Sequence, residues 1–118
     1  MPDTQKNLYK KLLGAKGERL AIKALKKQKY KILGKNLKNK YAEIDVLAIK
    51  KDVLCFCEVK TRTNDNFGTP AMAVDKSKQK KYREFAQIYL SENSLDCDVD
   101  FIVVEVTPQG VNVIEHAF

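Results

Sequence analysis

Two neighbouring stretches near the middle of the chain restrict its fold more than any other feature. Residues 41–50 (YAEIDVLAIK) and 53–60 (VLCFCEVK) are rich in β-branched, aromatic and aliphatic side chains, which favour strands. Only a turn at Lys50, Lys51 and Asp52 separates them, and so short a connection joins antiparallel strands. The sequence therefore predicts a β-hairpin over residues 41–60.

Helical periodicity lies on both sides of this hairpin. In residues 8–29 and again in 70–93, apolar or small side chains recur every three or four positions. Further segments are expected as a strand at 30–33, a turn-rich loop at 34–40, an exposed loop at 61–70, a buried strand at 100–106 and an edge strand at 111–118. The order α, β, β, β, α, β, β predicts an α/β fold, a central mixed sheet flanked by helices, in a single domain over residues 1–118.

The composition excludes several classes of protein. Hydrophobic residues make up 44% of the chain and charged residues 31%, a globular balance. No segment has the roughly 20 apolar residues of a membrane helix, and the first residues lack a secretory signal. We therefore expect a cytoplasmic protein with no membrane partner. The three cysteines are too few for a disulfide scaffold and are expected to be buried thiols, and the single histidine, His116, argues against histidine-based catalysis.

Positive charge is concentrated in the first half of the chain. The net charge is +7, yet residues 1–62 contain 17 basic and 6 acidic side chains, whereas residues 84–118 contain 7 acidic side chains and no Lys or Arg. A basic surface of this size attracts polyanions, with nucleic acid as the leading partner. Because lysines outnumber arginines 19 to 3, a merely solvated lysine face is the alternative interpretation.

Three charged residues of the hairpin form a candidate metal site. Glu58 and Lys60 interrupt an apolar strand and share a face, because side chains alternate along a strand. A turn centred near residue 51 places Asp45 opposite Cys57 and diagonal to Glu58. A slip of a residue or a twist of the strands would bring the two carboxylates within reach of one ion. Mg²⁺ typically binds one or two carboxylates, and a nearby lysine can stabilise charge on a phosphate. The alternative is that Glu58 and Lys60 form an ordinary surface ion pair.

Each helix contributes one further candidate. Glu18 follows Gly17 on the flank of the first apolar stripe and could reach the metal directly or through water, or it could make an ordinary contact within the helix. Lys78 falls where the stripe of the second helix requires an apolar residue. A carboxylate cluster or a bound phosphate would compensate its charge, and extension of the side chain to solvent is the alternative.

Five motifs in sequence order resemble those of the YraN-type bacterial family, placed in the PD-(D/E)xK nuclease superfamily with restriction enzymes and archaeal Holliday junction resolvases. They are GAKGERLAIKAL, the EID of YAEID, CEVKTR, FGTPAMAVDKSKQKK, and VDFIVVEV with VIEHAF. The similarity covers residues 14–118. One departure is Ala42, where the family usually has glycine before Glu-Ile-Asp, and it affects the turn into the strand more than the chemistry.

The resemblance implies a restriction endonuclease-like αβββαβ core with Asp45, Glu58 and Lys60 at catalytic positions. Glu18 matches a glutamate of the resolvase-like branch. Lys78 matches a family lysine on the second helix, with Gln79 beside it as the weaker candidate. Arg62 matches the basic residue after the ExK strand. Asp45, Glu58 and the Val59 carbonyl are then expected to bind Mg²⁺ or Mn²⁺, with Glu18 supporting a ligand or second ion. Glu43 is left out of this expected site.

The expected function is metal-dependent hydrolysis of phosphodiester bonds in DNA, with branched or structured DNA favoured by analogy to the resolvases. Lys60 would assist the nucleophile. Residues expected to bind phosphates are Lys16, Arg19, Lys23, Arg62, Lys76, Lys80 and Lys81. The rivals are a catalytically silent nucleic-acid-binding module of a DNA-handling assembly and a protein that binds no nucleic acid. Symmetric cleavage of two strands would favour a homodimer, although no interface is marked in the sequence.

Overall fold

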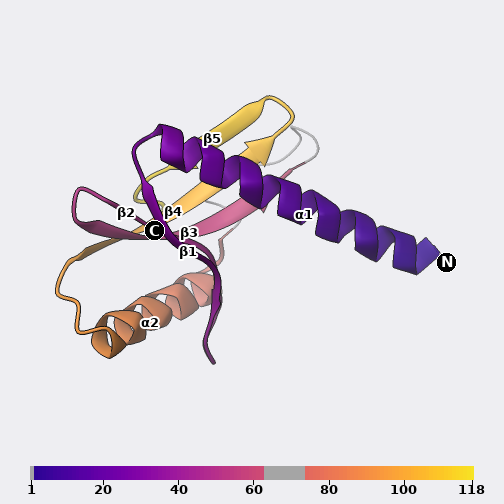
Figure 1. Ribbon diagram of the computed structural model, residues 1–118. Helices are drawn as coiled ribbons and strands as arrows, with labels where there is room; N and C mark the ends of the chain where they lie inside the picture. Colours follow the sequence, from indigo (N-terminus) through magenta and orange to yellow (C-terminus); the bar gives the residue numbers. More distant parts are fainter. Residues whose placement is uncertain (1, 63–73) are drawn as a thin grey trace.

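The described residues form one mixed sheet of five strands at the centre of the fold, in the spatial order β1-β2-β3-β4-β5. The computed structural model describes residues 2–62 and 74–118, and the side chains of residues 13–62 and 74–118. The strands are β1 (Lys31–Lys38), β2 (Glu43–Lys50), β3 (Val53–Thr61), β4 (Asp98–Thr107) and β5 (Gly110–Ile114). Only β3 and β4 run parallel, connected through α2 (Lys76–Glu92), while α1 (Pro2–Lys27) precedes the sheet (Figure 1). This confirms the expected α/β fold and is compatible with a restriction endonuclease-like core.

The two helices cover opposite faces of the sheet (Figure 1). Alternate residues of each strand point to opposite sides, so one set packs under each helix. Cys55 and Cys57 on β3 join the apolar cluster under α1. Leu54 and Phe56 join the cluster under α2. β3 is therefore apolar on both faces up to Cys57, and its first charged side chain is Glu58.

Gly17 allows α1 to approach β3 closely. A Cβ atom at this position would lie 2.0 Å from the Thr61 side-chain oxygen, far inside van der Waals contact. The helix continues through Ala21 and Leu25, which are fully buried against the sheet. The neighbouring residue, Glu18, is thereby held close to the end of β3.

Several predicted boundaries were wrong. The first helix spans Pro2–Lys27 rather than 8–29, and β1 extends to Lys38, through the stretch expected to be a loop. An irregularity in pairing between Ile32 and Gly34 interrupts the strand pattern there, which hid the continuation. The final strand ends at Ile114 rather than continuing to 118. Residues 63–70 of the predicted loop, and 70–73 of the predicted second helix, lie outside the described residues.

Helix α2 begins later than its apolar periodicity suggests, at Lys76. Asp75 is its N-cap, and the Asp75 carboxylate accepts the backbone N–H of Lys78 at 2.8 Å. Capping side chains of this kind satisfy backbone donors that have no partner within the helix. The cap fixes the start of the helix and with it the position of the Lys78 side chain.

The β2–β3 hairpin turns through only two residues, Lys51 and Asp52, which have positive φ angles of 51° and 64°. Such a pair fits the twist of antiparallel strands. Lys50 pairs with Val53, and consequently Val46 lies opposite Cys57. The predicted register, with Asp45 opposite Cys57, was wrong by one residue. Lys50 was expected in the turn but belongs to β2, where it pairs with Val53.

The cysteines agree in part with the sequence prediction. All three are free, and Cys55 and Cys57 are buried, whereas Cys97 is partly exposed. Burial raises the pKa of the Cys55 thiol to about 11, and that of Cys57 is raised as well. Both thiols are therefore protonated and behave as small apolar side chains. Within the described residues, no helix has the length and apolar character needed to cross a bilayer.

Candidate active site

The β2–β3 ladder ends at the pair Val46–Cys57, and the two strands then separate. β2 instead keeps its pairing with β1 as far as the pair Lys38–Glu43. At the point of separation, the Asp45 carboxylate accepts the backbone N–H of Val59 at 2.8 Å. A carboxylate thus takes the place that a backbone carbonyl of β2 would occupy in a continued ladder.

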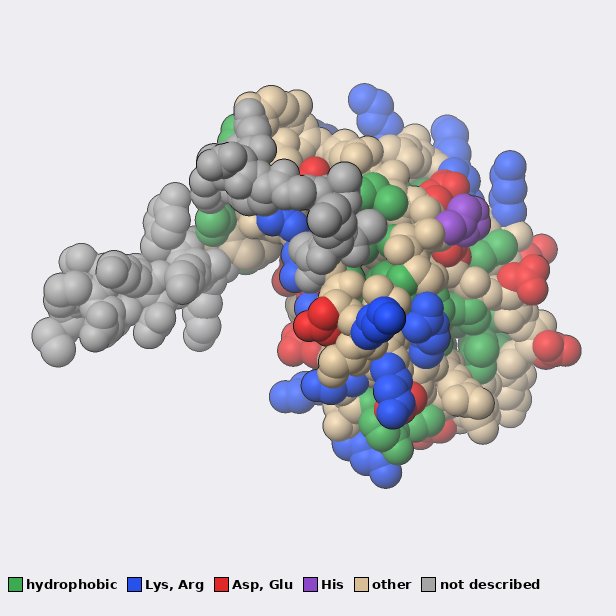
Figure 2. All heavy atoms as spheres, turned by 180° about the vertical axis from the view of Figure 1, so that it is seen from behind, with side chains coloured by type: hydrophobic (Ala, Val, Ile, Leu, Met, Phe, Trp, Pro, Cys, Tyr) green, Lys and Arg blue, Asp and Glu red, His purple; other side chains and the backbone are tan. Residues whose placement is uncertain are grey.

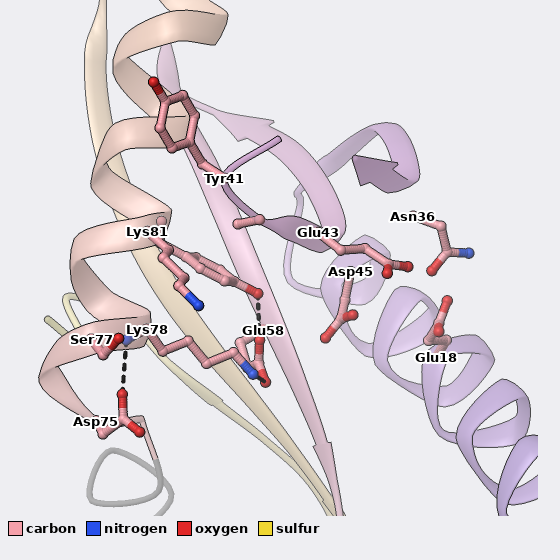
Figure 3. Close-up of a pocket in the computed structure, with 12 residues that line it drawn as sticks. Glu18, Asn36, Tyr41, Glu43, Asp45, Glu58, Asp75, Ser77, Lys78 and Lys81 are labelled. Atoms are coloured by element: carbon pink, nitrogen blue, oxygen red, sulfur yellow. Dashed lines mark hydrogen bonds and ion pairs between the residues drawn. The ribbon is translucent and has the colours of Figure 1, made fainter. Parts of the chain in front are cut away.

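A cavity of about 540 Å³ lies at this fork (Figure 3). Its walls come from α1, β1, β2, β3 and the first turns of α2, so every described helix and strand before β4 contributes to it. Five carboxylates line it, together with two lysines: Glu18, Glu43, Asp45, Glu58, Asp75, Lys78 and Lys81. The cavity brings five of the predicted site residues into one place: Glu18, Asp45, Glu58, Lys78 and Lys81.

Glu58 is buried, at 4% exposure, and is held by three donors. Lys78 Nζ lies 2.5 Å and Lys60 Nζ 3.2 Å from Glu58 Oε1, while the Tyr82 hydroxyl donates to Oε2. Burial alone would raise the pKa of Glu58, but the hydrogen bonds from Lys78 and Tyr82 and the charges of the two lysines outweigh it and lower the pKa. Glu58 is therefore ionised at neutral pH.

The pKa of Asp45 is shifted upward, in the opposite direction to that of Glu58. Burial raises its pKa, the hydrogen bond from Val59 opposes that rise, and the negative charges of Glu58 and Glu18 add to it, leaving the pKa at about 6. The ionised Asp45 is thus poorly compensated. A cation placed beside it would relieve repulsion among the three carboxylates.

The donor set suits a hard divalent ion such as Mg²⁺ or Mn²⁺, which prefers carboxylate oxygens. Asp45 provides one carboxylate with uncompensated charge. The Val59 carbonyl faces the fork as well, because the N–H and C=O of one strand residue point toward the same neighbouring strand. Glu58 could join these ligands only after Lys78 has moved. In the described parts of the chain, no three His, Cys, Asp or Glu side chains lie close enough to surround one ion.

Comparison with known proteins gives the chain its family. The model of the family described as "Uncharacterised protein family UPF0102" matches residues 17–106. The chain belongs to the UPF0102 family. It is 44% identical to a UPF0102 protein of Caldanaerobacter subterraneus subsp. tengcongensis, over 96% of this chain and 99% of the relative. A UPF0102 protein of Alkaliphilus oremlandii is 41% identical, over 92% and 98% of the two chains.

The region that matches UPF0102 contains the whole cavity. It begins at Gly17, where α1 touches β3, and ends at Val106 on β4. Every carboxylate that lines the fork, from Glu18 to Asp75, falls inside it.

Lys60 reaches Glu58 without lining the cavity. Its side chain is 28% exposed, so the ammonium lies at the edge of the site. Two predicted phosphate-binding residues lie elsewhere. Lys16 and Arg62 line a second cavity of about 310 Å³, between α1 and the ends of β3 and β4. Arg62 Nε pairs there with Glu105 at 3.2 Å, so its charge is already compensated.

The remaining predicted phosphate-binding residues are exposed on the two helices: Arg19 and Lys23 on α1, and Lys76, Lys80 and Lys81 on α2. Lys80 lies 3.9 Å from Glu84 one turn later, and Gln79 donates its amide to the Val74 carbonyl. On the face seen in Figure 2, Lys and Arg side chains stand among Asp and Glu side chains. The positive charge on that face is thus interspersed with negative charge.

Tyr82 and Glu43 are among the site residues that were missed from the sequence. Tyr82 was assigned to the apolar stripe of the second helix, yet its hydroxyl binds Glu58. Its spacing of four residues from Lys78 was the available signal, because residues four apart share a helix face. Glu43 was left out, but it lines the cavity with Asp45 (Figure 3), since residues two apart on a strand point the same way.

Proposed function

We propose that the chain is a metal-dependent nuclease of the PD-(D/E)xK type that hydrolyses phosphodiester bonds in DNA. The observation that carries the proposal is the fork between β2 and β3. There, Asp45 and Glu58 from adjacent strands line one cavity, and the Lys60 ammonium lies 3.2 Å from Glu58. The resemblance of the EID and CEVKTR motifs to the PD-(D/E)xK superfamily supports the same assignment.

Asp45, Glu58 and the Val59 carbonyl would hold the divalent ion, with Glu18 from α1 beside them. When bound, Mg²⁺ or Mn²⁺ supplies positive charge against the phosphate oxygens. Lys60 would orient the attacking water or stabilise negative charge that develops on the phosphate. Exposed lysines of α1 and α2 would bind the flanking phosphates, so DNA affinity should fall steeply as salt concentration rises.

A catalytically silent nucleic-acid-binding module is the second candidate, and one observation favours it. Glu58 is engaged by Lys78, Lys60 and Tyr82 together, which leaves little room for an ion on Glu58 in this arrangement. Such a protein would keep the fold and the basic surface and would bind DNA without cutting it.

Single-turnover cleavage of labelled junction, flap and linear DNA in Mg²⁺ or Mn²⁺ tests the proposal. We expect Asp45→Asn and Lys60→Met to lose at least about 100-fold in rate, the size expected for a lost charge-stabilising group. The control is Lys35→Met, which removes an exposed lysine on β1 and should cleave like the wild type. Equal cleavage by all four proteins would indicate a contaminating nuclease and reject the assignment.

Binding measurements separate the remaining functions. DNA binding at low salt without cleavage of any substrate, in either metal, would establish the silent module. Failure to bind DNA or RNA at low salt would reject both candidates and leave the basic surface as a solvated one.

A further inference from the structure

Lys78 joins a buried carboxylate to the open cavity. Its Nζ lies 2.5 Å from Glu58 Oε1, and Glu58 has only 5% of its side chain exposed. The Lys78 side chain is itself 38% exposed. It lines the cavity, as Figure 3 shows. One end of this ion pair is fixed in the protein, and the other is a flexible side chain that can reach solvent.

The ammonium of Lys78 and a divalent cation would compete for Glu58. Both would lie against the same carboxylate oxygen, and two positive charges a few ångströms apart repel strongly where water is scarce. Lys60 competes less directly, because it lies at the edge of the site and does not line the cavity. Separating Lys78 from Glu58 also requires another anion near the ammonium, because breaking the ion pair without a new partner would cost free energy.

An incoming phosphate meets these needs. Lys78 lies in the first turn of α2, where the helix dipole favours anions and where the sequence KSKQKK contains no acidic residue. Lys81, one turn later, lines the same cavity and is exposed to the same ligand. A phosphate at the mouth of the cavity would therefore attract Lys78 outward.

We propose that Lys78 occupies the cation position on Glu58 in the free protein and transfers to a DNA phosphate when substrate binds, so that metal and DNA bind cooperatively. This inference rests on the proposed function, because it assigns the metal to the same carboxylates. Coupling of two ligands is reciprocal, so DNA should tighten metal binding by the factor by which metal tightens DNA binding. The consequence is a site that binds its ion more tightly when substrate is present.

The test uses the full chain with Lys78→Met, and Lys78→Gln, which keeps a donor for Glu58 without the charge. Mn²⁺ binding to the free proteins is measured by calorimetry. Affinity for a fluorescent DNA junction is measured by anisotropy in EDTA and in Ca²⁺. Thermal unfolding verifies that each variant is folded. Lys81→Met is the matched control, a phosphate-binding lysine of the same helix and cavity whose loss should weaken DNA binding equally in EDTA and in Ca²⁺.

We expect Lys78→Met and Lys78→Gln to bind Mn²⁺ at least tenfold more tightly than the wild type. The gain in DNA affinity on adding Ca²⁺ should be at least tenfold in the wild type and in Lys81→Met. In both Lys78 variants it should be at least threefold smaller, because only the direct attraction between the ion and the phosphate remains. Mn²⁺ affinity that is unchanged or weaker in the Lys78 variants, or an unchanged gain from Ca²⁺, would overturn the exchange and leave the nuclease proposal intact. Absence of Mn²⁺ binding in every protein, the Lys78 variants included, would overturn both.

Discussion

The two ends of the β2–β3 hairpin are built on opposite principles. At the closed end, strands joined by the turn at Lys51 and Asp52 pair residue by residue, with apolar side chains on both faces. At the open end the ladder stops after Val46–Cys57, and carboxylates and lysines replace the apolar contacts. Apolar packing at the closed end stabilises the fold. This stabilisation offsets the free-energy cost of holding charges close together in the cavity at the open end.

Phe56→Ala tests the closed end and should have the largest effect on stability. Phe56 is fully buried and its ring lies 6.1 Å from that of Phe85 and 5.9 Å from that of Phe101, measured between centroids. Deleting a buried phenyl ring costs about 3–5 kcal/mol of unfolding free energy, because burial is lost and a cavity remains. Urea denaturation measures this loss. A loss below about 1 kcal/mol would show that packing at the closed end contributes little to the free energy of unfolding.

Glu58→Gln tests the first charged position of the open end. The substitution leaves Lys78 and Lys60 without their buried counter-charge, and we expect the free energy of unfolding to fall by about 1–3 kcal/mol at pH 7. The folded state lowers the pKa of Glu58, so this stabilisation is present above the ordinary pKa and is lost as the pH falls through the lowered value. Denaturation of both proteins at pH 7 and at pH 3 measures it. A variant more stable than the wild type at pH 7 would contradict the expectation.

Asp45→Asn should raise the free energy of unfolding, whereas Glu58→Gln should lower it. The folded state raises the pKa of Asp45 from 3.8 to about 6, so ionisation destabilises the fold, fully above pH 6 and progressively less as the pH falls toward 4. Asparagine keeps an oxygen for the Val59 N–H and carries no charge. We expect a gain of about 1–2 kcal/mol at pH 8 in EDTA, after allowance for solvent screening.

Denaturation curves from pH 4 to pH 8 provide the measurement for Asp45→Asn. The advantage over the wild type should disappear near pH 4. A loss of stability at pH 8, or a gain that does not change with pH, would show that the charge of Asp45 is compensated in solution.

Asp52→Gly should have the smallest effect, a gain of about 0.5–1 kcal/mol. Asp52 has a φ of 64°, and glycine adopts this conformation with less strain at the second position of a two-residue turn. The control is Lys50→Gly, which lies in the ladder opposite Val53 and should lose stability. Thermal unfolding distinguishes the two, and a gain in both variants would contradict the turn assignment.

The sequence predicted the elements of the fold well because they follow local rules. The hairpin, the two helices and their order came from periodicity and turn residues. The misplaced charge of Lys78 left a carboxylate cluster, a phosphate or solvent as its possible partner, and the structure pairs it with Glu58. The family resemblance placed Asp45 and Glu58 together in the expected site, and both line the cavity.

The fork itself could not be predicted from the sequence. Its position depends on the register, which changes with a single turn residue, and on Asp45 binding the backbone of β3 in place of a strand partner. The engagement of Glu58 by Tyr82 likewise depends on how α2 packs against the sheet, which periodicity alone does not define.

The contact between Gly17 and Thr61 has a consequence for the width of this cavity. Any larger residue at position 17 would bring a Cβ atom to 2.0 Å from the Thr61 side-chain oxygen, so either this hydroxyl or the first helix would have to move. If the helix moved, Glu18 would move with it, away from Asp45 on the opposite wall. The spacing between two acidic walls thus depends on a residue that has no side chain at all.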